Sequence, residues 1–395
     1  MEIYKLTPLT SLVWFQEGPG VRNTQYTNSG VKLLNVANLI DGHIDLSTSN
    51  RYIAEEEAYG RYRHFLCDKG DLVIASSGIK VDYFDKKMGF VRQEHLPLCM
   101  NTSTIRFKVL DKNILNIRYF MYFLKSNFFK SQLSKQITGS AQLNFGPSHL
   151  KRMIVPLINI DYQNHICGIL DKVYELEYKL QTELTLLNQL VKSRFIEMFG
   201  DLINEPKYPG IKLGSLGVMI TGGTPSRKHD EYYGGNIPFI STPCLGSNFI
   251  SEKNVQNYLT EAGVKNSATH KIPPYSLMVG NRVGVGKSSI NTCEMCTNQD
   301  ILSFVDIDTS RFDLLFLKKV IDQYSPYLDE HKRGATIQGV PSKVIKDSMV
   351  PDVPLEMQKR YTALVKQSDK SKLAVQKSLD ELETLKKSLM QTYFG

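Results

Sequence analysis

The sequence predicts a mixed α/β fold in which one unit of about 195 residues occurs twice. Two long segments with helical periodicity, 161–200 and 355–394, match each other at that spacing. The segment before each of them carries strand-like alternation, an amphipathic helix and a break containing Gly, Gln and Pro, in the same order. We therefore expect two globular domains separated by two long helices, which pair antiparallel as a coiled coil and are related by a pseudo-twofold axis.

Length and composition are those of an ordinary globular protein with more than one domain. The 395 residues are 42% hydrophobic and 22% charged, which is enough chain for two or three domains. No apolar run reaches 18 residues, the first ten residues are too polar for a signal peptide, and six cysteines are too few for a disulfide framework. We therefore expect a cytoplasmic protein with no membrane partner. The net charge of +8 points to a polyanionic partner and also fits an ordinary basic protein.

Residues 1–156 are predicted to form the first globular domain. Alternation with β-branched residues marks KGDLVIASSG (69–78) and TSTIRFKVL (102–110) as strands. The Gly- and Asn-rich stretch at 17–32 predicts an irregular loop. Apolar residues at helical spacing predict one amphipathic helix over 116–136, and a break with Gly and Pro then precedes the long helix.

The first long helix, expected within 157–200, has one apolar seam. Its apolar steps of three or four residues average about 3.5, the period of a helix packed along a coiled-coil seam. At about 1.5 Å per residue the helix would be roughly 60 Å long, so the seam needs a partner. The expected seam residues are Ile166, Ile169, Val173, Leu176, Leu180, Leu184, Leu187 and Val191.

The second half of the sequence supplies that partner. Residues 201–351 repeat the order of the first domain, and residues 352–395 repeat the long helix. The globular parts have diverged more than the helices, so the helices must keep one geometry while the domains perform two versions of one task. Ser368 and Ser371 stand where the first helix has apolar residues, so exact seam pairing is not expected near Ser371.

Three motifs resemble catalytic or metal sites but lack required residues. GNRVGVGKSSI (280–290) differs from a phosphate-binding P-loop because Gly280 stands one residue too early. IPPYS resembles a loop of adenine-N6 methyltransferases, but its first residue, Ile272, cannot hydrogen-bond a target amine. Cys293 and Cys296 have no second pair at zinc spacing. We expect no catalytic residue and no metal in this chain, and we expect the two prolines of IPPYS to form a surface turn.

What remains is a set of polar loop residues in each globular domain. Arg, Lys, Asn, Gln, Ser and Thr side chains contact phosphates and base edges, and the two repeated sets predict an interface with double-stranded DNA. Any one of these residues also fits an ordinary exposed loop. The candidates are Arg22, Asn23, Gln25, Ser76, Ser77, Lys80, Lys86, Lys87 and Arg92 in the first domain, and Thr224, Ser226, Arg227, Lys228, Arg282 and Lys287 in the second.

The order of these features, found twice, resembles the specificity subunit of type I restriction-modification systems over essentially the whole chain. GGTPSRKHDEYYGGNIPFIST (222–242) resembles the start of many target-recognition domains in that family, and NIRYFMYFLKSNFFKSQL (116–133) the helix before the join. GSAQLNFGPSHLKRMIVPLINIDYQNHICGILD (139–171) resembles the join from a recognition domain to a spacer helix. The join residues are Gly139, Gln142, Pro156 and Gln163 in the first copy, and Gly334, Gln338, Pro351 and Gln358 in the second. The first domain departs from the pattern, because EGPGVRNTQ stands where a loop like GGTPSR is expected.

The resemblance implies a non-catalytic subunit with two target-recognition domains. Each domain would recognise one half of a bipartite DNA site, and the helices would set the unread gap. Two methyltransferase subunits, which use S-adenosylmethionine and flip the target adenine, and two restriction subunits, which use ATP and Mg, would act on that site. The chain itself would hold no cofactor. The methyltransferase subunits would dock near the helices and joins, so Gln163 and Gln358 either serve that interface or cap the turn.

Two other functions stay open at this point. One is a stand-alone DNA-binding module without partner enzymes, and the other is an enzyme that acts alone. The base sequence recognised does not follow from the loop residues, because one loop can present several side chains to one groove.

Overall fold

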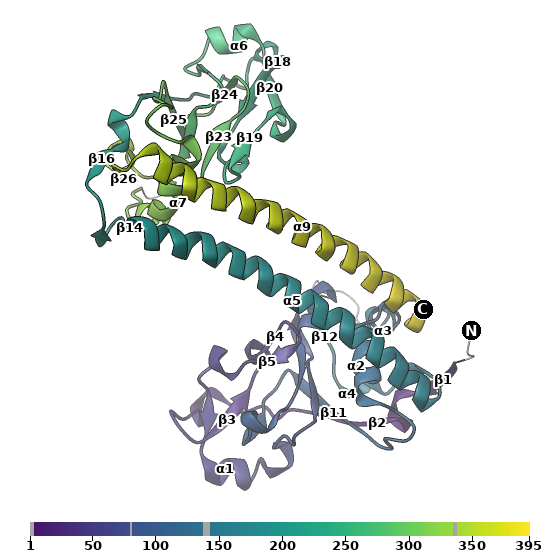
Figure 1. Cartoon of the computed structure of the whole chain (residues 1–395). Coiled ribbons are helices and arrows are strands. Elements are labelled where there is room, and N and C mark those ends of the chain that lie inside the picture. The colour runs from purple at the N-terminus through teal and green to yellow at the C-terminus, as the bar shows by residue number, and fades with distance from the viewer. Residues whose placement is uncertain (1–3, 80, 137–142, 335–337) are drawn as a thin grey trace. The chain divides into compact units, whose positions relative to one another are not determined.

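A computed structural model of the chain describes residues 4–79, 81–136, 143–334 and 338–395 (Figure 1). The chain divides into two compact units. Unit 1 comprises Met1–Lys179 and Ser378–Gly395, and unit 2 comprises Leu180–Lys377. Each unit therefore contains one globular part and about half of each long helix. Within the described ranges, no helix is both long enough and apolar enough to cross a bilayer.

Unit 1 is built on a four-stranded antiparallel sheet in the order β2-β11-β7-β9, beside a three-stranded sheet in the order β10-β3-β6. The first sheet consists of β2 (Val13–Glu17), β11 (Thr104–Val109), β7 (Leu72–Ala75) and β9 (Met88–Phe90). The second consists of β10 (Leu98–Met100), β3 (Val31–Leu34) and β6 (Tyr52–Ile53). The short strand pairs are β1 (Lys5–Pro8) with β13 (Ile154–Leu157), β4 (Leu39–Ile40) with β5 (His43–Ile44), and β8 (Ser77–Ile79) with β12 (Leu143–Asn144). The helices of the globular part are α1 (Glu55–Tyr59), α2 (Ile117–Lys125), α3 (Asn127–Ser134) and α4 (Pro147–Leu150).

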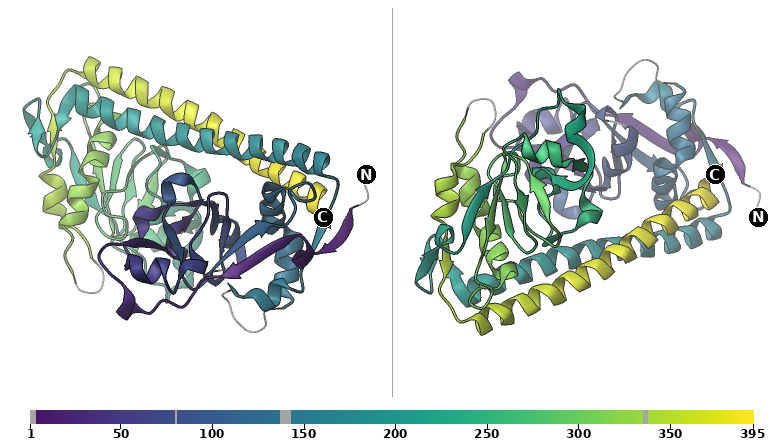
Figure 2. Two further views of the ribbon diagram at one scale, coloured as in Figure 1. Left: turned by 90° about the horizontal axis from the view of Figure 1, so that it is seen from below. Right: turned by 90° about the horizontal axis from the view of Figure 1, so that it is seen from above.

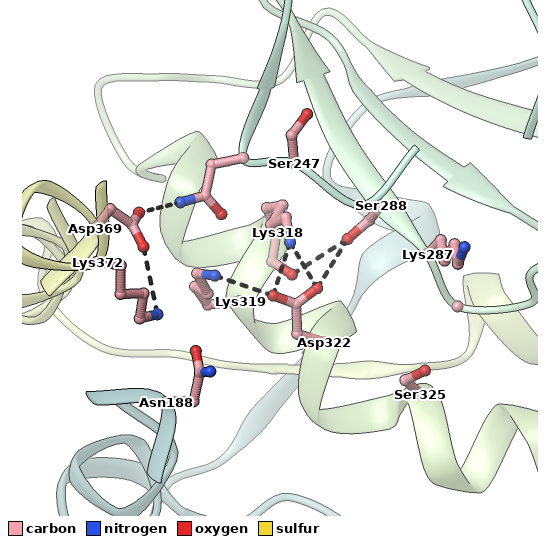
Figure 3. Close-up of a pocket in the computed structure, with 13 residues that line it drawn as sticks. Asn188, Ser247, Lys287, Ser288, Lys318, Lys319, Asp322, Ser325, Asp369 and Lys372 are labelled. Carbon is pink, nitrogen blue, oxygen red and sulfur yellow. Dashed lines mark hydrogen bonds and ion pairs between the residues drawn. The ribbon is translucent and has the colours of Figure 1, made fainter. Parts of the chain in front are cut away.

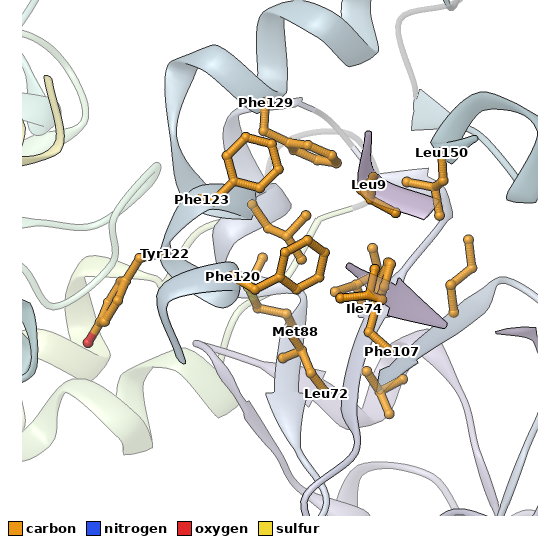
Figure 4. Packing of buried hydrophobic residues seen from close by; sticks show 14 of the residues in the cluster. Leu9, Leu72, Ile74, Met88, Phe107, Phe120, Tyr122, Phe123, Phe129 and Leu150 are labelled. Carbon is orange, nitrogen blue, oxygen red and sulfur yellow. The ribbon is translucent and has the colours of Figure 1, made fainter. Parts of the chain in front are cut away.

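The core of unit 1 lies where α2 and α3 pack on the four-stranded sheet (Figure 4). Every residue of β7 is buried, because the sheet is covered on both faces at that strand. Phe107 of β11 meets Phe120 of α2 edge to face, with ring centroids 5.2 Å apart, and Phe123 meets Phe129 at 5.5 Å. Each such fully buried aromatic side chain stabilises the fold by about 2–3 kcal/mol. The predicted strands at 69–78 and 102–110 are confirmed as β7 and β11.

The single amphipathic helix predicted over 116–136 is wrong, because the segment forms two helices separated by Ser126. The backbone of Ser126 is extended, with ψ 155°. Its hydroxyl donates to the carbonyl of Phe123 at 2.6 Å and accepts from the N–H of Phe129 at 3.2 Å. Serine competes in this way with the helical hydrogen bonds, so it ends α2 and begins α3. The equivalent helix of unit 2, α7 (Leu314–Glu330), is unbroken although it contains Pro326.

Unit 2 is built on a five-stranded sheet in the order β17-β25-β22-β23-β19 and a four-stranded sheet in the order β20-β18-β24-β21. The first sheet consists of β17 (Val218–Thr221), β25 (Ile301–Val305), β22 (Leu277–Gly280), β23 (Ser288–Asn291) and β19 (Phe249–Ile250). The second consists of β20 (Asn257–Leu259), β18 (Tyr233–Ile240), β24 (Met295–Thr297) and β21 (Lys271–Ile272). The short pairs are β14 (Gly200–Asp201) with β15 (Glu205–Pro206), and β16 (Gly210–Lys212) with β26 (Met349–Pro351). The remaining helices of the globular part are α6 (Glu261–Lys265) and α8 (Ser342–Lys346).

The two units repeat one topology, as the sequence predicted. The strand order β2-β11-β7-β9 corresponds to β17-β25-β22-β23, and the pair β1–β13 corresponds to β16–β26. The parallel pair of β10 with β3 likewise corresponds to the parallel pair of β24 with β18. Unit 2 differs in two additional edge strands, β19 and β21. The two globular parts are therefore two versions of one mixed α/β scaffold.

The two long helices are α5 (Ile160–Phe199) and α9 (Leu355–Phe394), with 40 residues each. Within each unit their segments run side by side (Figure 2). In unit 2 the hydroxyls of Ser368 and Tyr361 donate to the carbonyls of Leu187 and Val191, respectively. Residue numbers thus fall along α9 as they rise along α5, which confirms the antiparallel pairing. The predicted bounds of the second helix agree with those of α9.

The helix seam differs from the prediction at Leu176, and at Ser368 the two helices stay paired although no apolar residue is present. Leu176 was expected in the seam but is 47% exposed, which makes that assignment wrong. Its neighbour Glu177 takes the place and accepts from the ammonium of Lys386 at 2.7 Å. Ser368, where an apolar residue was missing, is buried and its hydroxyl reaches the carbonyl of Leu187 at 3.4 Å. A small polar side chain therefore keeps the helices paired at that position.

A fully buried glutamine closes the join between globular part and long helix in each unit. The amide oxygen of Gln163 accepts from the backbone N–H of Asn116 at 2.9 Å. Its nitrogen donates to the carbonyls of Ile114 and Ile158, both at 2.8 Å. Gln358 makes the same three bonds to the matching backbone groups of unit 2. Of the two roles left open by the sequence, the structure supports the internal one, because neither amide is exposed to a partner. Two of the join residues, Gly139 and Gln142, lie outside the described residues.

Candidate nucleic-acid interface

In each unit, polar loops gather at one end of the four antiparallel strands that the two central sheets have in common. In unit 2 this is the end where β17 and β22 finish and where β25 and β23 begin. In unit 1 it is the equivalent end, where β2 and β7 finish and where β11 and β9 begin. Loops 222–232, 281–287 and 298–300 therefore meet in unit 2. Loop 18–30 and turn 101–103 meet in unit 1.

The loop after β17 begins with two glycines because the backbone passes too close to two neighbouring segments, the turn at Asn298 and the backbone at Thr269, for any side chain. A Cβ on Gly222 would lie 2.2 Å from the carbonyl oxygen of Asn298, and one on Gly223 would lie 2.6 Å from the backbone N of Thr269. The loop is then tied to the Asn298 turn by the Thr224 hydroxyl, which donates to the side-chain oxygen of Gln299 at 2.6 Å. The predicted candidate Thr224 thus lies beside a residue that the sequence had not singled out.

The three remaining candidates of this loop, Ser226, Arg227 and Lys228, are exposed. Tyr233 holds the loop in place, because its hydroxyl donates to the carbonyl of Pro225 at 2.6 Å. An anchored loop with two exposed cations is suited to an extended anion, since phosphate contacts come from such side chains and from backbone N–H groups.

The loop between β22 and β23 presents Arg282 and Lys287, both exposed. Gly284 and Gly286 adopt left-handed conformations, with φ 83° and 75°, which allow the tight return of the chain. The Arg282 guanidinium lies 3.7 Å from the carboxylate of Asp300. A strand follows this loop, whereas a P-loop opens a helix, so the nucleotide-binding interpretation is excluded by the backbone as well as by the glycine spacing.

In unit 1, Arg22 and Asn23 are exposed on the loop between β2 and β3. Gln25 lies on the same loop but is engaged internally: its amide donates to the carboxylate of Glu57 at 2.8 Å and to the hydroxyl of Tyr62 at 3.1 Å. Its oxygen accepts from the backbone N–H of Arg22 at 3.1 Å, so Gln25 holds the loop that presents the other two.

The candidates at the end of β7 divide between buried and accessible positions. Ser76 is 1% exposed, so its hydroxyl is not presented to a ligand in this conformation, while Ser77 is half-buried. Lys86 is exposed near Asp41, at 3.7 Å, and Lys87 is half-buried. Lys80 lies outside the described residues.

Arg92 lies at the opposite end of the sheet from the other candidates. It follows β9, which runs away from the polar loops, and it forms an exposed ion pair with Glu94 at 3.6 Å. The sequence placed Arg92 among the candidates by residue type, and only the strand direction separates it from them.

Lys87 and Lys287 occupy equivalent positions in the two units. The carbonyl of Lys87 accepts from the N–H of Ala75 at 2.8 Å, and the carbonyl of Lys287 accepts from the N–H of Gly280 at 2.8 Å. Lys87 directly precedes β9 and Lys287 directly precedes β23, and both lie at the end of the sheet where the polar loops gather. The two units therefore present one lysine from the same place in the scaffold.

A family comparison matches both copies of the repeat. The family described as the type I restriction modification DNA specificity domain matches residues 21–187 and again residues 208–384. The chain belongs to this family. Each match contains one set of polar loops and most of one long helix, so we call the two matched regions the first and second specificity domains.

Relatives with specificity domains are similar to part of this chain. The MjaIX specificity subunit of a type I restriction enzyme from Methanocaldococcus jannaschii is 27% identical over 155 residues, which is 39% of this chain and 36% of that protein. The HindI specificity subunit from Haemophilus influenzae is 30% identical over 124 residues, 31% of this chain and 27% of that protein. The chain thus spans about a third of the length of these relatives.

Two solved structures are similar over nearly the whole chain. The type I restriction-modification S subunit from M. genitalium has a TM-score of 0.57 and 14% identity, covering 99% of this chain and 96% of that one. A chain from a structural study of complex assembly and conformational transition of the type I R-M system has a TM-score of 0.58 and 15% identity, covering 100% of this chain and 98% of that one. At these identities the likeness shows a shared fold.

The structure adds Thr102 and Gln299 to the surface of the two specificity domains. Both are exposed and occupy the same position in the turn before β11 or β25. Next to them, Asn101 and Asn298 are buried and support the turn. The sequence carried a signal for these turns, because Asn101-Thr102 and Asn298-Gln299 directly follow the equivalent strands β10 and β24.

Proposed function

We propose that this chain is the DNA-recognition subunit of a type I restriction-modification system, and that each specificity domain recognises one half of a bipartite duplex site. One observation carries the proposal: equivalent ends of two equivalent sheets present polar loops of different composition. Arg22 and Asn23 lie on the loop of the first domain, and Arg227 and Lys228 on that of the second. Different side chains on one scaffold are what recognition of two different half-sites requires.

We propose further that the paired helices set the number of unread base pairs between the half-sites. Each helix has 40 residues without interruption and contributes residues to both units, and α5 joins the first globular part to the second along the chain. A helix advances about 1.5 Å per residue, and duplex DNA about 3.4 Å per base pair along one strand. A change in helix length would therefore change the distance between the two half-sites along the duplex.

Catalysis, in this proposal, belongs to partner subunits in the cytoplasm. Two methyltransferase subunits would bring S-adenosylmethionine, and two restriction subunits would bring ATP and Mg. Exposed apolar residues support two equivalent docking surfaces, because they recur 195 residues apart on the long helices. Tyr178 and Leu373 are 70% and 74% exposed, and Leu190 and Leu385 are 48% and 49% exposed.

The half-site assignment is tested by exchanging residues 211–340 for the same domain of a relative with a known site. Single-molecule sequencing of methylated adenines in the host then gives the recognised motif before and after the exchange. We expect one half-site to change and the other to stay. A change in both half-sites would overturn the assignment of one half-site to each domain.

The absence of catalysis in this chain is tested with purified protein, duplex DNA and labelled S-adenosylmethionine. We expect label in the DNA only when the methyltransferase partners are added. Transfer of label by the chain alone would show that it is an enzyme itself.

A further inference from the structure

A cavity of about 630 Å³ in unit 2 lies between the globular part and both long helices (Figure 3). Its walls come from α7, from segments 246–248 and 286–288, and from residues of α5 and α9. Figure 3 shows Lys319 of α7, Lys372 of α9 and Asn188 of α5 around the opening between the three helices. None of the activities proposed above assigns a role to this cavity.

The cavity contains more positive than negative side chains. Four lysines and two aspartates line it. Lys318 donates to both oxygens of Asp322 at 2.8 Å, and Lys319 reaches the same carboxylate at 3.2 Å. Lys372 lies 3.5 Å from Asp369. Three ammonium groups therefore share two carboxylates, and the fourth is that of Lys287.

Both carboxylates are also held by neutral donors. The amide of Asn248 donates to Asp369, and the hydroxyl of Ser288 donates to Asp322 at 3.2 Å. These donors are neutral and leave the charge balance unchanged, so four lysines still face two aspartates. An anion entering the cavity would add the missing negative charge.

Burial makes a positive charge without a full negative counterpart costly. Lys318 is only 3% exposed, and burial lowers the pKa of its ammonium group. A buried ammonium is favoured when another negative group approaches it. The cavity is thus poised to stabilise a bound anion more strongly than an exposed pair of lysines would.

The corresponding cavity in unit 1 is not basic in the same way. It encloses about 510 Å³ and lies against the same two long helices. At the positions 195 residues before Asp369 and Lys372, it has Tyr174 and Glu177. Three of its four lysines have carboxylate partners, in the pairs Lys130–Asp85, Lys386–Glu177 and Lys387–Glu383, each at 2.7 Å, and the ammonium of the fourth, Lys125, lies 4.3 Å from the centre of the Tyr174 ring. The positive excess is therefore larger in unit 2, with four lysines to two aspartates, than in unit 1, with four lysines to three acidic side chains.

The cavity of unit 2 adjoins the predicted DNA-contacting loops. Lys287 belongs both to the cavity and to the loop that presents Arg282. That loop lies directly on α7, because a Cβ on Gly286 would be 3.0 Å from backbone and side-chain atoms of Ser325. A basic path thus leads from the recognition loops to Lys319 and Lys372 without leaving unit 2.

We propose that this cavity binds a phosphate of the DNA backbone next to the half-site recognised by the second specificity domain, with Lys319 and Lys372 as donors and Lys287 at its edge. The proposal rests on the proposed function. A phosphate contact carries no base information but fixes the position of the protein on the duplex. It also displaces counterions, so its loss has a measurable salt signature.

The test uses the Lys372→Gln and Lys319→Gln variants, with Lys265→Gln as a matched control. Lys265 is an exposed lysine of the same unit that lies outside the cavity. The chain, with any subunits that co-purify, is titrated with a 40-base-pair duplex carrying the methylated motif and with a scrambled duplex, across a salt series. Thermal unfolding of each variant shows that the fold is retained.

We expect each cavity variant to lower the slope of log affinity against log salt by about 1, and to weaken binding about fivefold near 0.15 M salt. Both duplexes should be affected alike, because the contact is independent of sequence. Asp369→Asn should act in the opposite direction and tighten binding, since it removes a negative charge from the cavity. Lys265→Gln should change neither slope nor affinity.

Cavity variants that behave like Lys265→Gln would overturn the phosphate site, while the proposed function would stand as long as the wild type prefers the motif duplex. If those variants instead lost only a co-purifying subunit, the cavity would hold an acidic protein segment and the proposal would be wrong. A wild type that bound neither duplex would remove the proposed function itself.

Discussion

Replacing Gln358 by Met should destabilise unit 2 strongly while leaving the surface of the protein unchanged. The side chain is fully buried at the start of α9 and makes three hydrogen bonds to the backbone. It accepts from the N–H of Asp313 at 2.9 Å and donates to the carbonyls of Arg311 and Val353 at 3.1 and 2.9 Å. Methionine has nearly the same shape but offers none of these bonds, so three backbone groups lose their partners, in one buried and two part-buried bonds.

The size of the effect follows from that count. A buried polar group left without a partner costs about 1–3 kcal/mol, and part of this is recovered where the backbone relaxes toward water. We therefore expect the free energy of unfolding of unit 2 to fall by about 2–5 kcal/mol. Gln163→Met should have an effect of the same size on unit 1, because Gln163 makes the matching three bonds.

Native-state hydrogen exchange measures the effect unit by unit, because amides of the two units report on separate openings. Gln367→Met is the control, since Gln367 is exposed on the same helix. A cost below about 1 kcal/mol for Gln358→Met, or equal losses of protection in both units, would refute the structural role. A loss of partner binding with unchanged protection would instead support the interface role that the sequence had left open.

Three further predictions concern a buried ion pair, a thiol and the helix length. Arg106→Met should lower the stability of unit 1 by about 3 kcal/mol in urea unfolding, because it removes the 3.2 Å ion pair with Asp71 and leaves that buried carboxylate with Lys108 alone, at 3.6 Å. The exposed Arg51→Met should cost far less, and equal costs would contradict this. Burial raises the pKa of Cys67 to about 12, so at pH 8 this residue is a protonated thiol. Mass spectrometry should therefore find that Cys67 is alkylated in the native protein at a small fraction of its rate in urea. Equal rates in the native protein and in urea would show that the thiol is accessible. Inserting seven residues, two helical turns, after Leu184 and at the paired position of α9 should lengthen the unread gap of the methylated motif and keep both half-sites, whereas an unchanged gap would remove the spacing role of the helices.

Local patterns in the sequence predicted the repeat, the two long helices and two strands of the central sheet of unit 1. The bounds of α9 and the strands β7 and β11 followed from residue periodicity, which reports on the few neighbours that a residue meets along its own element. The positions of the polar loops followed as well, because Gly-rich segments between strands mark turns wherever they occur. The two exposed prolines between β21 and β22 also form the expected surface turn.

Tertiary structure decided which of these residues are accessible and which groups lie together. Ser76 and Gln25 are polar loop residues by sequence, but one is buried and the other bonds to Glu57 and Tyr62. Glu177, rather than Leu176, meets the partner helix, since its ammonium partner comes from a segment 209 residues away. Such contacts depend on how elements distant in sequence pack together, and periodicity along one element carries no information about them.

The basic cavity of unit 2 shows this limit most clearly. Lys287, Lys319 and Lys372 belong to a loop, to α7 and to α9, and each alone fits an ordinary lysine of its own element. The sequence by itself determined two copies of one scaffold and the loops that each copy presents. Only the packing of α7 against both long helices brings three distant ammonium groups to one cavity, because their proximity arises from folding and not from spacing along the chain.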